Sequence, residues 1–307
     1  MDTTLTHRNA AVRAKVIDRI SSHLVWICGV SLIAITVTIA AFLVVQGSAT
    51  FTVFGHSIRE FLTSAEFNPS QAPDGTERGQ VGAAVYIVGS LYVCGVALAI
   101  ALPFSLGAAV FLTEIAPRIG DKLFRPAVEL FLGIPSVVYG WVGMTVLLRL
   151  FKDESKGLTG ESVLAASIVL AVMIFPTITT VSADAMRAVP DDYRIGAYGL
   201  GSTRWQVIYR VVLPAAKVGI FTGIILGLAR AFGEALAVAM VIGKTKAFAA
   251  TILNGTSTLT TAMTADMQEA AEGSEFKAAL WTLALVLFLI SMLCILIIHV
   301  ISRRRSQ

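Results

Sequence analysis

The stretch GLARAFGEALAV carries two opposite charges, Arg230 and Glu234, inside an apolar run over residues 218–242. Twelve residues separate Arg230 from either end of this run, so a helix over 218–242 would place the guanidinium at mid-membrane depth. A central arginine costs about 2.5–3.5 kcal/mol on insertion scales. The i,i+4 spacing lets the two side chains touch and offset part of that cost. The pair is therefore either a structural ion pair or part of a substrate path.

Three glycines indicate which way the charges face. Gly219, Gly223 and Gly227 form a small-residue series, the pattern of close helix contact in membranes. At about 100° per residue, Arg230 and Glu234 fall on the same face as these glycines. We therefore expect both charged side chains to point toward a packing partner and away from lipid. Replacing a buried ion pair by apolar residues is often neutral or stabilising, which favours a substrate path or gate over a purely structural pair.

The elements that must position this pair are membrane spans. Only 14% of the 307 residues are charged and 56% are hydrophobic, whereas a soluble domain is about 25% charged. A transmembrane helix needs about 20 apolar residues. The sequence thus predicts an all-α integral membrane protein with six transmembrane helices, at residues 24–46, 83–112, 126–151, 163–181, 218–242 and 279–301.

Three prolines interrupt the predicted spans. Pro103, Pro135 and Pro176 lie inside the second, third and fourth spans. Breaks of this kind survive in a bilayer only where neighbouring helices or water satisfy the freed backbone groups. We therefore expect a packed bundle around a cavity, forming one transmembrane domain over residues 24–301.

The distribution of Lys and Arg predicts the orientation. With the N-terminus inside, 15 of the 24 basic residues fall in inside segments and eight in outside loops. Positive charge stays on the cytoplasmic side of membranes, so both the N-terminal segment 1–23 and the tail 302–307 are expected in the cytoplasm. The basic residues are spread among loops and form no patch, so a nucleic-acid partner is not indicated.

The predicted inside loop at 189–214 carries sequence signals for two short helices. Asp191 and Asp192 are good helix-start residues, and Gly201 can end that helix in a left-handed conformation. Thr203–Gln206 fits a capping box that opens a second helix. The sequence predicts a compact helix–turn–helix on the cytoplasmic face. A DNA-binding unit and a mere connector are alternative readings, but a loop tied at both ends to spans is better placed to dock a partner protein.

No catalytic constellation accompanies these features. The three cysteines show no pairing or CxxC pattern, and the four histidines are scattered among different segments, so no disulfide framework or metal site is indicated. The GKT at Gly243 resembles the end of a P-loop, but Val238 occupies the required upstream glycine position. We therefore expect a non-enzymatic chain, and any ATP that drives transport is hydrolysed by another chain.

The 189–214 loop resembles the EAA motif of bacterial ABC importer permeases. Its slots are filled by Ile195, Gly196, Ala197, Gly201, Val211, Leu213 and Pro214. Ile195 replaces the acidic residue of the family, so the family's contact through that glutamate is not implied here, whereas the docking fold is. The resemblance implies that this loop forms coupling helices in a groove of the ATPase subunit, with Ala197, Gly201, Leu213 and Pro214 at the coupling positions.

Longer segments are similar to PstC-type permeases of phosphate ABC importers. These segments are LAIALPFSLGAAVFLTEIAP (98–117), ELFLGIPSVVYGWVG (129–143), the loop over 186–214, ILGLARAFGEALAVAMVIG (225–243) and GSEFKAALWTLALVLFLI (273–290). The resemblance implies a MetI-like permease of six spans in the bacterial inner membrane. Its implied partners are a PstA-type permease, two PstB-type ATPase subunits that use ATP and Mg, and a periplasmic PstS-type phosphate-binding protein. No cofactor is expected on this chain itself.

In that family the Arg and Glu of the RAxGE segment are implicated in phosphate movement, and they match Arg230 and Glu234. Arginine offers a planar fork of donors that suits phosphate oxygens. Phosphate keeps a proton at neutral pH, which Glu234 could accept in a hydrogen bond, whereas sulfate has none to donate. Ser136 and Tyr139 in IPSVVYG are further candidates for lining the path.

The sequence is also compatible with other functions. Within transport, the alternatives are a permease for another oxyanion and the PstA-type partner. From different classes, a channel or ion-coupled transporter would work without an ATPase, and a structural membrane subunit would keep the charges only as a buried pair.

Overall fold

The computed structural model describes residues 3–72, 78–153 and 159–303. The chain forms two compact units, Met1–Gln46 and Gly47–Gln307. Helix α1 runs over Thr3–Thr52, so the expected N-terminal segment and the expected first span belong to one helix. Its portion Ser21–Thr52 is long and apolar enough to cross a membrane. Residues 304–307 of the expected C-terminal tail lie outside the described residues.

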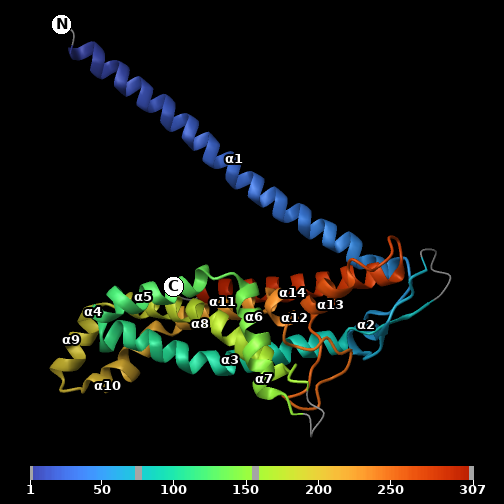
Figure 1. Ribbon diagram of the computed structural model, residues 1–307. Helices are drawn as coiled ribbons and strands as arrows, with labels where there is room; N and C mark the ends of the chain where they lie inside the picture. The colour runs from blue at the N-terminus through green and yellow to red at the C-terminus, as the bar shows by residue number, and fades with distance from the viewer. Residues whose placement is uncertain (1–2, 73–77, 154–158, 304–307) are drawn as a thin grey trace. The chain divides into compact units, whose positions relative to one another are not determined.

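The second unit is built almost entirely of helices (Figure 1). Four of them are long: α3 (Ala84–Val110), α8 (Val163–Arg187), α11 (Leu213–Gly233) and α14 (Glu275–Arg303). The shorter elements are α2 (Ile58–Thr63), β1 (Phe67–Asn68), β2 (Gln80–Val81), η1 (Phe111–Ile115), α4 (Pro117–Ile119), η2 (Gly120–Phe124), α5 (Arg125–Gly133), α6 (Ser136–Val142), η3 (Gly143–Leu147), α7 (Leu148–Phe151), α9 (Asp191–Gly199), α10 (Arg204–Val207), η5 (Ile208–Val212), α12 (Leu236–Ala239) and α13 (Leu259–Asp266), where η marks a π-helical turn.

The predicted all-helical membrane class is confirmed. Within the described residues, five helices are long and apolar enough to cross a membrane, or six if one bent pair counts as a span. The bent pair joins 117–133 to 136–151 at an angle of 91°. It corresponds to the predicted third span, and Pro135 lies at its break, as expected.

The other two prolines do not break their helices, so that prediction is wrong. Pro103 lies inside α3 and Pro176 inside α8, and both helices continue. Hydroxyl groups join the two helices near this level: Ser105 donates to the Phe175 carbonyl at 3.3 Å, and Thr179 donates to the Ser105 carbonyl at 3.5 Å. Membrane helices tolerate proline where neighbouring helices and hydroxyl side chains support the backbone in this way.

Helix α8 lies at the centre of the bundle and packs against both α3 and α11. Two-thirds of its apolar window (67%) is buried inside the structure, against 17% for α14. A separate apolar cluster, which includes Leu112, Met186 and Val207, connects the ends of α3 and α8 with α10. Helix α8 is therefore the central helix that α3 and α11 both contact.

The end of the unit formed by α2 and the start of α14 is held by a buried polar cluster. The Glu275 carboxylate accepts hydrogen bonds from the backbone N–H groups of Ser70, at 2.7 Å, and Gly79, at 2.8 Å, and it pairs with His56. Strands β1 and β2, which flank these two residues along the chain, form a short antiparallel ladder that the all-helical prediction did not include. This cluster fixes the loop that leads into α3.

Candidate functional site

The glycine series of α11 lies in a close helix contact, as predicted, and the helix that it contacts is α8. A methyl group added at Gly219 would lie 2.3 Å from the Ala185 Cβ, and one at Gly227 would lie 2.7 Å from the Ile178 Cγ1. Gly223 faces Val181 in the same way. Only a residue without a side chain allows the two helix backbones to come this close. The face that carries the glycines is therefore the inward face of α11.

Arg230 lies in the last turn of α11 and is half-buried. Its Nη1 donates to Thr177 Oγ1 of α8 at 3.4 Å, so the side chain faces the packing partner, as the helix periodicity predicts. A guanidinium carries five N–H donors. Within the described residues, Thr177 is the one hydrogen-bond acceptor that Arg230 contacts. Most of its donors are therefore available to an anion.

The prediction of one helix over 218–242 is wrong, because α11 ends at Gly233. Glu234 follows in an extended conformation, with φ −77° and ψ 121°. Glu234 therefore leaves the helical face that Arg230 shares with the glycines. The two residues, both within the described chain, form no ion pair: Arg230 bonds to Thr177 and the Glu234 carboxylate to the backbone of Ala237. Arg230 accordingly lies near a helix end rather than at a helix centre.

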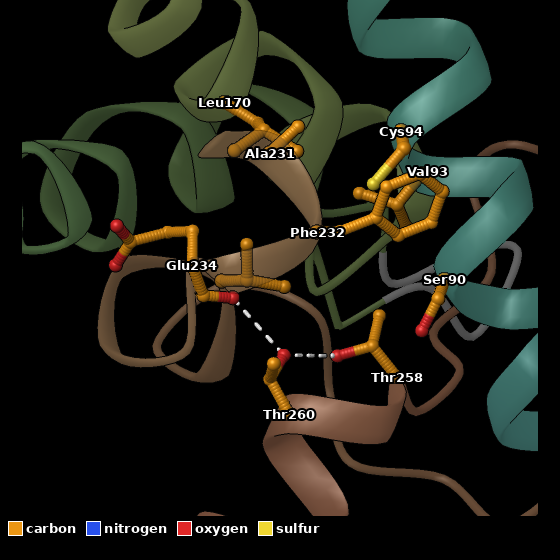
Figure 2. A pocket seen from close by; sticks show the side chains of 10 residues that line it. Ser90, Val93, Cys94, Leu170, Ala231, Phe232, Glu234, Thr258 and Thr260 are labelled. Carbon is orange, nitrogen blue, oxygen red and sulfur yellow. Dashed lines mark hydrogen bonds between the residues drawn. The ribbon is translucent and has the colours of Figure 1, made fainter. Parts of the chain in front are cut away.

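The break after Gly233 is stabilised on both sides of Glu234. The Glu234 carboxylate accepts from the backbone N–H of Ala237, in the first turn of α12, at 3.1 Å. The Glu234 carbonyl accepts from the Thr260 hydroxyl at 3.0 Å. Figure 2 shows the carboxylate pointing away from Thr260 and Thr258, while the carbonyl faces Thr260. Both bonds satisfy backbone groups that an interrupted helix leaves without partners.

A small cavity of about 10 Å³, with room for about one water, lies beside this break. Ser90, Thr258 and Thr260 line it together with Cys94 and Glu234, whose carboxylate points away from the two threonines (Figure 2). The Ser90 hydroxyl also accepts from the backbone N–H of Leu259 at 2.9 Å.

Sequence reasoning missed Thr177 and the threonines around the break. The run TSTLTT at 256–261 is a local signal of a polar segment, but it lies in a predicted outside loop. Thr177 directly follows Pro176, and only the packing of α8 on α11 identifies it as the partner of Arg230.

Ser136 and Tyr139 lie at the start of α6, directly after the Pro135 break. The Tyr139 hydroxyl donates to the Phe131 carbonyl at 2.8 Å, across the bend from α5. Tyr139 also packs, partly buried, against the apolar cluster that contains Ala231, the residue after Arg230. The structure therefore brings Tyr139 to the end of α11 where Arg230 lies, whereas the side chain of the half-buried Ser136 makes no hydrogen bond within the described residues.

A larger opening of about 420 Å³ lies where α6 and η3 face α12. Apolar side chains, including Val137, Met144 and Met240, form most of its wall, and Glu161 and Lys244 add opposite charges. Lys244 has a φ of 50°, in the left-handed region. The described residues contain no cluster of three or more His, Cys, Asp or Glu side chains that could hold a metal ion.

The helix–turn–helix predicted at 189–214 is confirmed. Helix α9 carries Asp191 and Asp192 in its first turn, and Gly201, with φ +81°, follows its end in the left-handed conformation. Thr203 and Gln206 form the expected reciprocal capping box at the start of α10. We call the α9–α10 pair the docking hairpin. Figure 1 shows both helices together at one end of the second unit.

The four EAA-like positions have different environments. Ala197 and Leu213 pack on the apolar cluster that contains Leu112. Pro214 lies in the first turn of α11, where the missing N–H has no consequence, and Gly201 forms the turn. The outer side of the docking hairpin exposes several large side chains: Tyr193, Ile195, Tyr198, Leu200 and Trp205.

Comparison with known proteins places the chain among transport permeases. Residues 101–307 match the family described as binding-protein-dependent transport system inner membrane component. The chain is 45% identical to the probable ABC transporter permease protein YqgH of Bacillus subtilis (strain 168), over 91% of this chain and 89% of that protein. It is 36% identical to the phosphate transport system permease protein PstC of Pasteurella multocida (strain Pm70), over 78% of each chain.

Solved structures agree with the fold. Inward-facing conformations of the MetNI methionine ABC transporter superimpose with a TM-score of 0.54, covering 70% of this chain and 94% of that one at 18% sequence identity. At this identity the likeness supports the fold alone. The family match extends over two-thirds of the chain and includes the docking hairpin and the Arg230 region. The chain therefore belongs to the family of binding-protein-dependent transport system inner membrane components.

Proposed function

We propose that the chain is the permease subunit of an ATP-driven importer of inorganic phosphate, located in the bacterial inner membrane with both termini in the cytoplasm. Several relatives at 32–36% identity, each aligned over about four-fifths of this chain, are named phosphate transport system permease protein PstC. The family itself supports a transport subunit. The choice of phosphate depends on those relatives and on the chemistry of Arg230.

The availability of the Arg230 guanidinium is the observation that carries the proposal. The side chain lies on the inward, glycine-lined face of α11, and its one described acceptor is a hydroxyl at 3.4 Å. Arginine binds phosphate oxygens through parallel N–H groups more specifically than lysine does. A half-buried guanidinium with most donors available is suited to attract an oxyanion that passes along α11.

Glu234 would favour phosphate over sulfate. One carboxylate oxygen bonds to the Ala237 N–H, and a carboxylate has acceptor capacity beyond one bond. Phosphate at neutral pH retains a proton that Glu234 can accept in a hydrogen bond, whereas sulfate does not. As a negative charge four residues beyond Arg230, Glu234 would also oppose tight trapping of the anion. Tyr139, which packs at the end of α11, is a further candidate for the path, and Ser136 a weaker one.

Two PstB-type ATPase subunits would use ATP and Mg and dock on α9–α10, where Ala197, Gly201, Leu213 and Pro214 hold the hairpin on its spans. The exposed Ile195, in the slot where the EAA motif has an acidic residue, makes this contact apolar in the present chain. A PstA-type permease would complete the membrane path, and a periplasmic PstS-type protein would deliver phosphate.

The test is uptake by the complete complex reconstituted in liposomes, with radiolabelled phosphate and, in parallel, sulfate. Arg230→Gln should lower phosphate uptake about 10- to 100-fold, because charge-assisted hydrogen bonds contribute about 1.5–3 kcal/mol each. The matched control Arg149→Gln removes an exposed arginine in α7 and should leave uptake unchanged.

Three other uptake results would each support a different conclusion. Parent-level phosphate uptake by an assembled Arg230→Gln complex contradicts the role of Arg230. Sulfate uptake without phosphate uptake identifies a permease for another oxyanion. Flux from the purified chain without ATPase subunits indicates a channel or an ion-coupled transporter.

A further inference from the structure

The docking hairpin is attached to helix α3 through charged contacts that its chain connections do not require. The hairpin continues along the chain into α8 on one side and into α11 on the other. Helix α3 has no such link, yet η1 at its end carries Glu114, whose side chain is 9% exposed. Glu114 Oε1 accepts from Nη2 of Arg194, on α9, at 2.9 Å.

Arg194 gathers several acceptors at this junction. Besides Glu114, its guanidinium donates to the carbonyls of Met186, at 2.9 Å, and Val189, at 2.5 Å, which lie at the end of α8. It also pairs with Asp191 at 3.1 Å. A guanidinium presents its donors in a rigid plane, so these bonds fix the orientation of α9 relative to both η1 and the end of α8.

Arg204, on α10, binds the same turn. Its guanidinium donates to the backbone carbonyls of Glu114 and of Ile115, the latter at 2.7 Å. These carbonyls belong to the last turn of the span, where backbone acceptors have no partner within the helix. Both helices of the docking hairpin are therefore bonded to the end of α3.

The other end of α3 reaches the Glu234 break. Ser90, Val93 and Cys94 of α3 line the cavity that Glu234 also lines. Cys94 and Glu114 are 20 positions apart in a continuous helical segment, which corresponds to about 30 Å at 1.5 Å per residue. One helical rod thus connects the docking hairpin with the break beside Arg230.

We propose that Glu114 is a positioning residue that couples the docking hairpin to α3, so that movement of α9–α10 reaches the Glu234 break along α3 as well as along α11. The inference depends on the proposed function, in which an ATPase moves the hairpin. The apolar cluster around Leu112 and Val207 keeps the hairpin attached, and the Glu114–Arg194 pair makes α3 follow its motion.

The test compares Glu114→Gln with the parent in the complete reconstituted complex. The substitution keeps an oxygen acceptor for Arg194 and leaves the carbonyls for Arg204, so the fold and the binding of the ATPase subunits should persist. We expect phosphate moved per ATP hydrolysed to fall about tenfold, within the range of coupling energies measured along such networks. The matched control Glu129→Gln removes a carboxylate from the exposed Arg125–Glu129 pair of α5 and should change nothing.

A second readout needs no phosphate. In a background without the three native cysteines, a fluorophore at Leu91, exposed on α3, reports the response of α3 to ATP, and one at Leu226 reports that of α11. Glu114→Gln should abolish the Leu91 response and keep the Leu226 response. Unchanged coupling with an unchanged Leu91 signal overturns the proposal, and so does loss of both signals, which shows general loosening. If the parent complex moves no phosphate, the proposed function fails, while the two fluorophores still decide the role of Glu114.

Discussion

At the scale of single residues, Arg230 and Glu234 differ in what holds them. Arg230 has hydrogen-bond donors available, whereas Glu234 also stabilises the local backbone. Arg230 is held by one hydroxyl of α8 at 3.4 Å, near the outer limit of a hydrogen bond, which contributes little stability. A charge in a membrane bundle is costly and usually has a functional role. Glu234 differs, because its carboxylate also stabilises the first turn of α12 through Ala237. Substitutions of Glu234 must therefore separate charge from hydrogen bonding.

Two substitutions at Glu234 make that separation. Glu234→Ala removes the bond to the Ala237 N–H and should lower the free energy of unfolding by about 1 kcal/mol. Glu234→Gln keeps an acceptor there, so thermal unfolding in detergent should match the parent. Because the neutral side chain no longer opposes tight binding of the anion, its turnover of phosphate should fall together with its half-saturation concentration. Parent kinetics for Glu234→Gln would leave this residue with only its structural role.

At the scale of elements, the closeness of α8 and α11 positions Arg230. Gly219 and Ala185 form the tightest point of that contact, where an added methyl would lie 2.3 Å from the Ala185 Cβ. Neither a methyl group nor the short Ala185 side chain can rotate away, so the helices would have to separate. The inward direction of Arg230 therefore depends on this glycine.

A pair of substitutions tests the contact. Gly219→Ala should destabilise the protein by about 1–3 kcal/mol, the usual cost of overpacking. Adding Ala185→Gly removes the opposing Cβ and should restore most of the loss, measured as the midpoint of thermal unfolding. If Gly219→Ala unfolds at the parent temperature, or if the double variant is no better than the single one, the two helices do not pack as described.

Local signals determined which elements could be predicted from the sequence. The docking hairpin was predictable because its start, turn and capping box are encoded by neighbouring residues, Asp191, Gly201 and Thr203–Gln206. The break after Gly233 was not, because the hydroxyl that supports it comes from Thr260, 26 residues beyond Glu234. An apolar run looks like a continuous helix until such distant partners are known.

The same limit explains the prolines and the site. Pro103 and Pro176 remain in unbroken helices near hydroxyl contacts between α3 and α8, which the sequence of either helix alone does not reveal. Helix periodicity predicted the inward direction of Arg230 correctly. It placed Glu234 on the same face because it assumed one continuous helix over 218–242. In the structure the helix ends at Gly233, directly before Glu234.

At the scale of the whole molecule, coupling to a cytoplasmic ATPase requires that the docking hairpin face the cytoplasm. The excess of basic residues in the predicted inside segments supports this orientation. Single cysteines in a background without the native ones can test it. Leu200, 90% exposed on the hairpin, marks one side, and Phe248, half-exposed in the segment after α12, marks the other.

A membrane-impermeant thiol reagent should modify Leu200→Cys only in inside-out vesicles and Phe248→Cys only in intact cells or spheroplasts. The opposite pattern would place the hairpin outside, out of reach of any cytoplasmic ATPase, and would contradict the coupling mechanism.

The most direct test of the central claim, that Arg230 meets the anion, is phosphate protection of a cysteine placed beside it. Thr177→Cys introduces a thiol at the hydroxyl that Arg230 contacts, while the arginine itself is retained. In the assembled complex, an anionic thiol reagent should modify this cysteine in at least one nucleotide state, and phosphate should slow the modification. The protection should disappear when Arg230→Gln is added. A cysteine that stays unmodified in every nucleotide state, or protection that persists without Arg230, would contradict the account.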